Sequence, residues 1–193
     1  MFAYLEGALS YKSPSLLHLD TGGVGYEIHI TLQTYAKIQH ADRSRLLIHL
    51  QIREDAWVLY GFADESERTT FKALLGISGV GAATARLILS SLTPAELGKA
   101  VSQDDARSLQ MVKGIGAKTA QRIVLELKGK LSADNIGVTA AGHPLHNTKA
   151  DDALIALINL GIGRGAALEA LKKANQDESA SVEEMIKAAL RAL

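Results

Sequence analysis

The chain has 193 residues, and its 21 basic and 21 acidic side chains give a formal net charge of zero. Hydrophobic residues make up 47% of it, which suffices for packed cores in one large domain or in two to three small ones. The absence of cysteine excludes disulfides and thiolate chemistry, and no apolar run approaches the roughly 18 residues of a membrane-spanning helix. We therefore expect a cytoplasmic protein that binds no membrane, cofactor or metal.

Residues 1–62 alternate between apolar and polar side chains, as strands do. The alternation predicts strands at 2–10, 16–20, 25–30, 46–52 and 57–62, with Asp20-Thr21-Gly22-Gly23 as the turn after the second. Five short strands with little helix favour a small closed barrel of the oligonucleotide-binding (OB) type, because closure removes exposed edges. Half of a β-sandwich is the alternative.

From Asp64 onward the apolar positions recur with a helical period, which predicts helices at 67–75, 82–91, 94–102, 104–111 and 117–131. Thr93, Pro94 and Glu96 form a helix start, with a cap residue, a proline at the first position and an acid in the first turn. We assign residues 63–135 to one helical domain, so the chain belongs to the multi-domain α+β class.

This helical domain contains two copies of one pattern, 35 residues apart: Gly79-Val80-Gly81-Ala82-Ala83-Thr84-Ala85 and Gly114-Ile115-Gly116-Ala117-Lys118-Thr119-Ala120. A Gly-x-Gly turn between two helices permits positive φ and leaves free N–H groups at the start of the second helix, where anions bind. The duplication predicts a tandem helix-hairpin-helix domain that holds the backbone phosphates of DNA.

The charges around the second copy support this interpretation. Residues 113–130 hold five cations against the single acid Glu126. A cation at Lys118 opposes the helix macrodipole unless an anion lies beside it. The first copy has Ala83 and Leu87 at the positions of Lys118 and Arg122, so it depends more on backbone N–H groups. The predicted DNA-binding residues are Gly79, Gly81, Thr84, Arg86, Lys113, Gly114, Gly116, Lys118, Thr119 and Arg122.

Two glycine-rich stretches superficially resemble nucleotide-binding loops. In Gly114–Thr119 an alanine precedes the lysine and the preceding segment is helical, which excludes a P-loop. The stretch Gly161-Ile162-Gly163-Arg164-Gly165 follows no strand and lacks the last glycine of the dinucleotide pattern. The sequence therefore predicts no nucleotide site.

The stretch Arg53-Glu54-Asp55-Ala56 lies between two predicted strands, so its two carboxylates project from a hairpin tip. A solvated turn is the simplest interpretation. Beside a DNA-binding domain, a negative tip can also repel phosphates and separate strands. A metal-dependent nuclease site of Glu54, Asp55 and Asp64 is a further alternative, although the six histidines show no metal-ligand spacing.

Residues 136–148 are rich in small and polar types, which predicts a flexible linker. Beyond it, helices are predicted at 151–160, 164–174 and 181–193, so residues 149–193 form a three-helix unit. So small a core leaves little room for a cleft, which favours protein docking over catalysis. Candidates for the docking face are Leu160, Ile162, Leu168 and Leu171, and core positions are the alternative for each.

Taken together, these features resemble the RuvA family over essentially the whole chain. The resemblance rests on the barrel end Arg53–Phe62, on Glu67-Arg68-Thr69-Thr70-Phe71, on the paired turns, and on the tail Ile186–Leu193. Hairpin turns alone are common to many repair proteins, whereas their combination with the acidic tip and the tail is specific. One departure is Ala82-Ala83 in the first turn, where family members often carry a lysine.

The resemblance implies a non-catalytic subunit that binds Holliday (four-way) junctions during branch migration in recombination, DNA repair and the SOS response. It further implies an OB-fold barrel, a tandem hairpin domain and a UBA-like C-terminal domain that docks the hexameric ATPase RuvB, where ATP is hydrolysed. The family forms homotetramers, with octamers on DNA as an alternative, and RuvC resolvase belongs to the same complex. Glu54 and Asp55 would form an acidic pin at the crossover. A nuclease subunit and an adaptor without DNA affinity are the competing functions.

Overall fold

A computed structural model describes residues 2–133, 149–174 and 180–193. The chain divides into two compact units, Met1–Thr139 and Ala140–Leu193, and each is described here by itself. The predicted linker at 136–148 and the joint at Asn175-Gln176-Asp177 lie outside the described residues.

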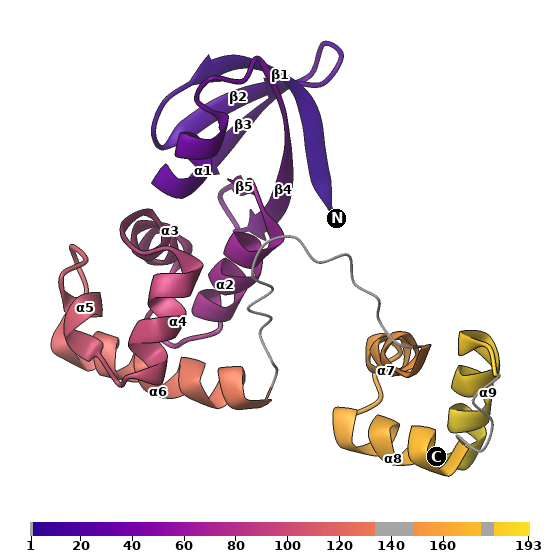
Figure 1. Cartoon of the computed structure of the whole chain (residues 1–193). Helices are drawn as coiled ribbons and strands as arrows, with labels where there is room; N and C mark the ends of the chain where they lie inside the picture. The colour runs from indigo at the N-terminus through magenta and orange to yellow at the C-terminus, as the bar shows by residue number, and fades with distance from the viewer. Residues whose placement is uncertain (1, 134–148, 175–179) are drawn as a thin grey trace. The chain divides into compact units, whose positions relative to one another are not determined.

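The first unit begins with a closed five-stranded barrel, drawn in indigo and violet in Figure 1. Its strands are β1 Tyr4–Lys12, β2 Leu16–Asp20, β3 Gly25–Ile30, β4 Arg43–Ile52 and β5 Trp57–Phe62. Antiparallel neighbours follow the order β1-β2-β3 and β1-β4-β5, and a parallel pairing of β3 with β5 closes the barrel. The predicted barrel is confirmed, and the sandwich alternative is wrong.

Three observed strand boundaries differ from the predicted ones. The first strand runs from Tyr4 to Lys12 rather than from 2 to 10, and the fourth begins at Arg43 rather than 46. Both extensions follow from pairing, because Ala8 lies opposite Arg43 and Lys12 lies opposite Leu17. The alternation of side chains places Leu17, Leu19, Ile28, Ile30, Leu46 and Ile48 in the barrel core.

The barrel also carries a helix that the sequence reasoning missed, α1 Leu32–Ile38. Thr31 is its N-cap, with extended backbone and a side chain that accepts from Thr34 N at 3.0 Å. At seven residues the helix is too short for a clear apolar period, and its stability comes from packing. Ile38 and Thr34 are buried, and α1 contacts α3 of the helical part.

Five helices complete the first unit: α2 Glu65–Leu75, α3 Ala82–Ser91, α4 Pro94–Ser102, α5 Ala106–Gln110 and α6 Ala117–Ala133. Their core is continuous with the outer face of β5, since Tyr60 packs on Phe71 with ring centroids 5.1 Å apart. Helix α5 is shorter than the predicted 104–111, because Asp104 adopts φ 54° and Asp105 caps the helix start. The capping box of Thr93 and Glu96 forms as the sequence predicts.

The second unit consists of α7 Lys149–Asn159, α8 Arg164–Ala174 and α9 Val182–Ala192. Its core contains the buried residues Ala153, Leu154, Leu157, Ala167, Ala170, Leu171, Met185 and Ala189. The helices lie within two residues of the predicted ranges. Among the described residues of both units, no helix is long and apolar enough to cross a membrane.

Candidate nucleic-acid interface

The two Gly-x-Gly turns adopt the same backbone conformation. The φ angle is 87° at Gly79 and at Gly114, in the left-handed region that glycine tolerates best. The residues between the glycines, Val80 and Ile115, are buried in the common core with 5% and 6% of their surface exposed. Each turn is therefore anchored by its central apolar side chain and presents its glycines outward.

Equivalent hydrogen bonds close both turns. Val80 N donates to Ile77 O at 3.0 Å, and Ile115 N donates to Val112 O at 3.1 Å. The duplication seen in the sequence is thus a duplication of backbone geometry.

The space in front of the glycines is open. A Cβ atom built on Gly79, Gly81, Gly114 or Gly116 would meet no heavy atom within 4 Å. At Gly81, whose φ is −85°, neither packing nor backbone conformation requires glycine. What the missing side chain provides there is free access to the backbone at the start of α3.

The helix starts at the two turns are electrostatically unneutralised. Gly81 is the N-cap of α3 and makes no side-chain cap hydrogen bond. The first turns of α3 and α6 contain no acid, as is also true of α1, α5 and α8, whereas those of α2, α4, α7 and α9 each contain at least one. The free N–H groups and the positive end of the macrodipole remain available to an external anion.

The predicted cations divide into free and engaged side chains. Lys113 and Lys118 are exposed, and within residues 2–133 neither forms an ion pair or a hydrogen bond. Arg122 donates from Nη1 to Ser78 O at 3.2 Å and lies 4.0 Å from Glu126, so it links the second hairpin to the first turn. Thr84 and Thr119 are half-buried at equivalent places.

Arg86 has a role inside the first unit. Its Nη1 atom donates to Ser15 O at 2.9 Å and lies 3.1 Å from Nδ1 of His29 in the barrel. Burial and then the Arg86 charge lower the pKa of His29, which favours the neutral imidazole, the form whose Nδ1 can accept from Arg86. The contact joins α3 to the barrel, and a contact of Arg86 with DNA stays a prediction.

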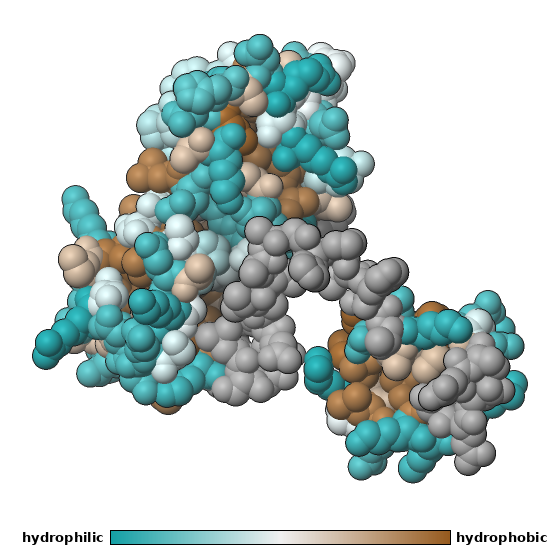
Figure 2. Space-filling model, in the orientation of Figure 1, coloured by the Kyte–Doolittle hydropathy of each residue, from teal (hydrophilic) through white to brown (hydrophobic). Residues whose placement is uncertain are grey.

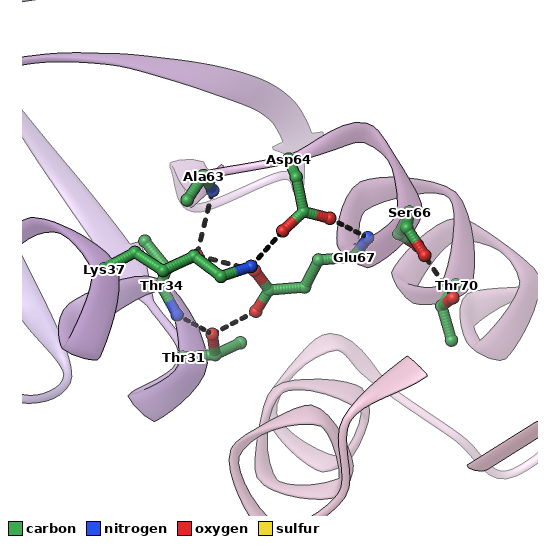
Figure 3. A network of polar contacts seen from close by, with 8 residues as sticks. All are labelled: Thr31, Thr34, Lys37, Ala63, Asp64, Ser66, Glu67 and Thr70. Carbon is green, nitrogen blue, oxygen red and sulfur yellow. Dashed lines mark hydrogen bonds and ion pairs between the residues drawn. The ribbon is translucent and has the colours of Figure 1, made fainter. Parts of the chain in front are cut away.

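A second joint between barrel and helices is a buried polar network (Figure 3). Glu67 of α2 is 1% exposed, and its two carboxylate oxygens accept hydrogen bonds from the hydroxyls of Thr31 and Thr34, the latter at 2.7 Å. The Thr34 hydroxyl also accepts from Ala63 N at 3.0 Å. Burial raises the pKa of Glu67, against the opposing effect of the two hydroxyl donors.

Asp64 completes this network from the other side. It is the N-cap of α2, with Oδ1 accepting from Glu67 N at 2.9 Å and Oδ2 paired with Lys37. Against the effect of burial, the hydrogen bond from Lys37 and those from the backbone lower the pKa of Asp64. The network fixes α1 against α2 and thereby fixes the barrel relative to the hairpin turns.

Sequence reasoning missed this network, although part of its signal is visible. Glu67 precedes Phe71 and Leu74 at helical spacing, so a carboxylate occupies the apolar stripe of α2. A charge on a buried stripe requires partners. Those partners lie 33 and 36 residues earlier in the chain, one within α1 and one at its N-cap, and the alternation pattern did not reveal that helix.

The acidic tip lies where the sequence places it. Arg53 N donates to Ala56 O at 2.9 Å and closes the hairpin of β4 and β5 around Glu54 and Asp55. All residues from Ile52 to Trp57 are exposed. The carboxylates therefore project beyond the barrel.

The nuclease alternative finds no support. The Asp64 carboxylate caps α2 and forms an ion pair with Lys37, and neither contact involves the tip residues Glu54 and Asp55. Across the described ranges, no three His, Cys, Asp or Glu side chains are grouped so that they could hold a metal ion.

In the second unit, the four predicted docking residues have different environments. Leu171 is buried in the core, and Ile162 packs against that core with partial exposure. Leu160 and Leu168 are 64% and 39% exposed. Leu168 and Leu171 line an open depression of about 160 Å³ together with Ala150, Asp151, Leu154, Lys172 and Met185. Figure 2 shows hydrophobic side chains at the surface of this unit.

Comparison with known proteins covers the whole chain. Residues 1–61 match the family described as RuvA N terminal domain, residues 71–130 match the SAM-like helix-hairpin-helix tandem, and residues 148–193 match the RuvA C-terminal domain. Similar curated proteins bear the name Holliday junction branch migration complex subunit RuvA. The protein of Leptothrix cholodnii is 46% identical, over all of this chain and 99% of its own. Those of Porphyromonas gingivalis and Christiangramia forsetii are 44% and 41% identical over the full length of both chains.

Proposed function

Because the chain belongs to the RuvA family, we propose that it binds four-way DNA junctions as a subunit of a branch migration complex. The observation that supports this most strongly is the pair of identical glycine turns, open to ligand and unneutralised at the helix starts behind them. Backbone N–H groups at a helix start bind phosphate without reading sequence. Two equivalent turns in one rigid core would hold one duplex arm at two places.

Recognition of the junction itself needs a second feature, because phosphate contacts alone do not distinguish a junction from simple duplex. The exposed carboxylates of Glu54 and Asp55 are suited to this. Close to a continuous duplex they would repel phosphates, whereas at a crossover the strands diverge and leave room for them. We propose that the turns supply affinity and the tip supplies preference for the junction shape.

The proposal extends to the assembly. We infer that the subunit is non-catalytic and cytoplasmic and that it forms homotetramers whose fourfold symmetry matches four arms. ATP hydrolysis would belong to RuvB, docked through residues 149–193, with RuvC in the same complex. Leu168 and Leu171 both line the apolar depression. Leu168 is the more exposed of the two and is therefore our favoured contact with RuvB, whereas Leu171 is buried. Residues 1–62, 63–135, 136–148 and 149–193 would act as barrel, DNA grip, linker and docking domain.

The direct test is a gel-shift comparison of a four-way junction with linear duplex built from the same arm sequences, alongside mass determination by light scattering. We expect tighter binding of the junction and a mass of four chains or a multiple of it. The double variant Glu54→Gln with Asp55→Asn should bind duplex more tightly and lose preference for the junction. Equal affinity of the unchanged chain for both DNAs would refute the proposal, as would strand scission by the chain alone in magnesium.

A further inference from the structure

The most exposed aromatic side chain of the described residues lies next to the acidic tip. Trp57 opens β5 with 74% of its surface in solvent, and it is the single tryptophan of the chain. Ile52, which ends β4, is 64% exposed. Isolated exposed apolar residues are common on protein surfaces and require no explanation. Here, however, two large ones are adjacent.

Pairing places both side chains on one face of the hairpin. Ile52 and Trp57 lie directly opposite each other in the antiparallel ladder of β4 and β5. Residues in register across a ladder project to the same side. Leu50 and Leu59, the next pair on that side, are partly buried, so the apolar face continues from the barrel wall outward and becomes exposed at the tip.

The chemistry around this face restricts what can cover it. The two residues of the turn, Glu54 and Asp55, are acids that outnumber the neighbouring exposed cation Arg53, so a phosphate or an acidic peptide would be repelled. The flat face of a nucleobase carries no charge, and it stacks on aromatic rings without regard to sequence. A base can reach Trp57 only when it is unpaired and unstacked, and bases at a crossover lose their pairing partners whenever strands exchange.

We propose that Trp57, backed by Ile52, forms a stacking platform for an unpaired base at the junction crossover. This inference rests on the proposed function and assigns an additional specificity-determining residue to the same site. The carboxylates of Glu54 and Asp55 exclude phosphates, while the indole ring holds the base that strand separation exposes. Trp57 thereby lowers the free energy of the opened crossover relative to the paired one.

Variants at this position separate stacking from a merely structural role. Trp57→Val retains a β-branched strand former opposite Ile52 but has no ring. Trp57→Phe retains a smaller ring. If Trp57 stacks on a base, Trp57→Val binds the junction roughly 5- to 150-fold more weakly, Trp57→Phe recovers most of the loss, and duplex affinity stays unchanged. If Trp57 only stabilises the hairpin, Trp57→Val also loosens the acidic tip and therefore raises the affinity for duplex; that result, like an unchanged junction affinity of both variants, would overturn the proposal.

The single tryptophan gives a direct spectroscopic readout on the unaltered chain. We expect its fluorescence to be quenched when junction DNA is added and to remain unchanged with duplex at concentrations that give equal occupancy. Tyr11→Ala, which removes an aromatic side chain 48% exposed on β1, is the matched control and should leave quenching and affinity intact. Emission that is blue-shifted before DNA is added and insensitive to it would place Trp57 between copies of the chain and overturn the proposal. Preference for the junction with no effect of Trp57→Val would also overturn it, while leaving the proposed function standing.

Discussion

The joint between barrel and hairpin helices can be tested by removing one hydroxyl. Thr34 has no exposed surface, and its hydroxyl donates to Glu67 at 2.7 Å and accepts from Ala63 N at 3.0 Å. Thr34→Val preserves shape and therefore creates no cavity. It leaves the partly buried N–H of Ala63 without an acceptor, at about 1–3 kcal/mol, and takes one hydrogen bond from the buried carboxyl of Glu67, at about 1.5–3 kcal/mol when that carboxyl is ionised. The free energy of unfolding should fall by about 2.5–6 kcal/mol.

Urea unfolding of the full chain, followed by far-ultraviolet circular dichroism, measures this loss. With a slope of about 2 kcal/mol per molar urea, the midpoint should fall by roughly 1–3 M. Thr70→Val is the matched control, because Thr70 is partly buried on α2 and its hydroxyl donates to Ser66 O of that helix in a solvent-exposed hydrogen bond (Figure 3). Its midpoint should change by less than about 0.25 M, which corresponds to about 0.5 kcal/mol. A similarly small change for Thr34→Val would refute the view that this network holds the two parts together.

Further predictions concern pH, backbone conformation and phosphate contact. Because burial raises the pKa of Glu67, the contribution of Glu67 to stability is complete below the ordinary pKa of glutamate and is lost as the pH rises through the raised pKa. The stability advantage of the unaltered chain over Glu67→Gln should therefore shrink between pH 4.5 and 7.5. A difference in urea midpoints that stays constant over this range would contradict this. Gly114→Ala should lower the free energy of unfolding by about 1–2 kcal/mol, because φ is 87° at Gly114. Gly98→Ala should raise the free energy of unfolding by about 0.5–1 kcal/mol, because Gly98 lies in the middle of α4 with open space around it. Thermal melts that rank the two variants in the opposite order would disprove this reasoning. Lys118→Ala should reduce the slope of log affinity against log salt by about 0.9 in junction titrations, while Lys72→Ala on α2 leaves it unchanged; equal slopes for all three proteins would remove Lys118 from the phosphate contacts.

Much of the fold could be predicted from local patterns. Alternation located all five strands of the barrel, and the Thr93-Pro94-Glu96 start was placed to the residue because caps and proline act over a single turn. The sequence predicts positive φ within the Gly-x-Gly turns, and the first glycine of each, Gly79 and Gly114, adopts it, since few side chains tolerate that conformation. The errors fall where local propensity is weak. Helix α1 is too short to show a period, and Asp104 ends the preceding turn with a positive φ that its residue type does not require.

In the candidate site, too, local features could be predicted from the sequence and long-range contacts could not. Glycine turns, acidic tip and cations were found from residue type and spacing, because each of these features lies within a few consecutive residues. The engagement of Arg86 with His29, and of Glu67 with Thr31 and Thr34, joins segments from 33 to 57 residues apart and could not be read from any local pattern. By itself, therefore, the sequence determined where the glycine turns, the acidic tip and the candidate cations lie. The tertiary structure alone decided which of the predicted cations stay exposed and which charged side chains bind other parts of the chain to fix the barrel to the hairpins, because burial and partner choice depend on contacts made only after the chain has folded.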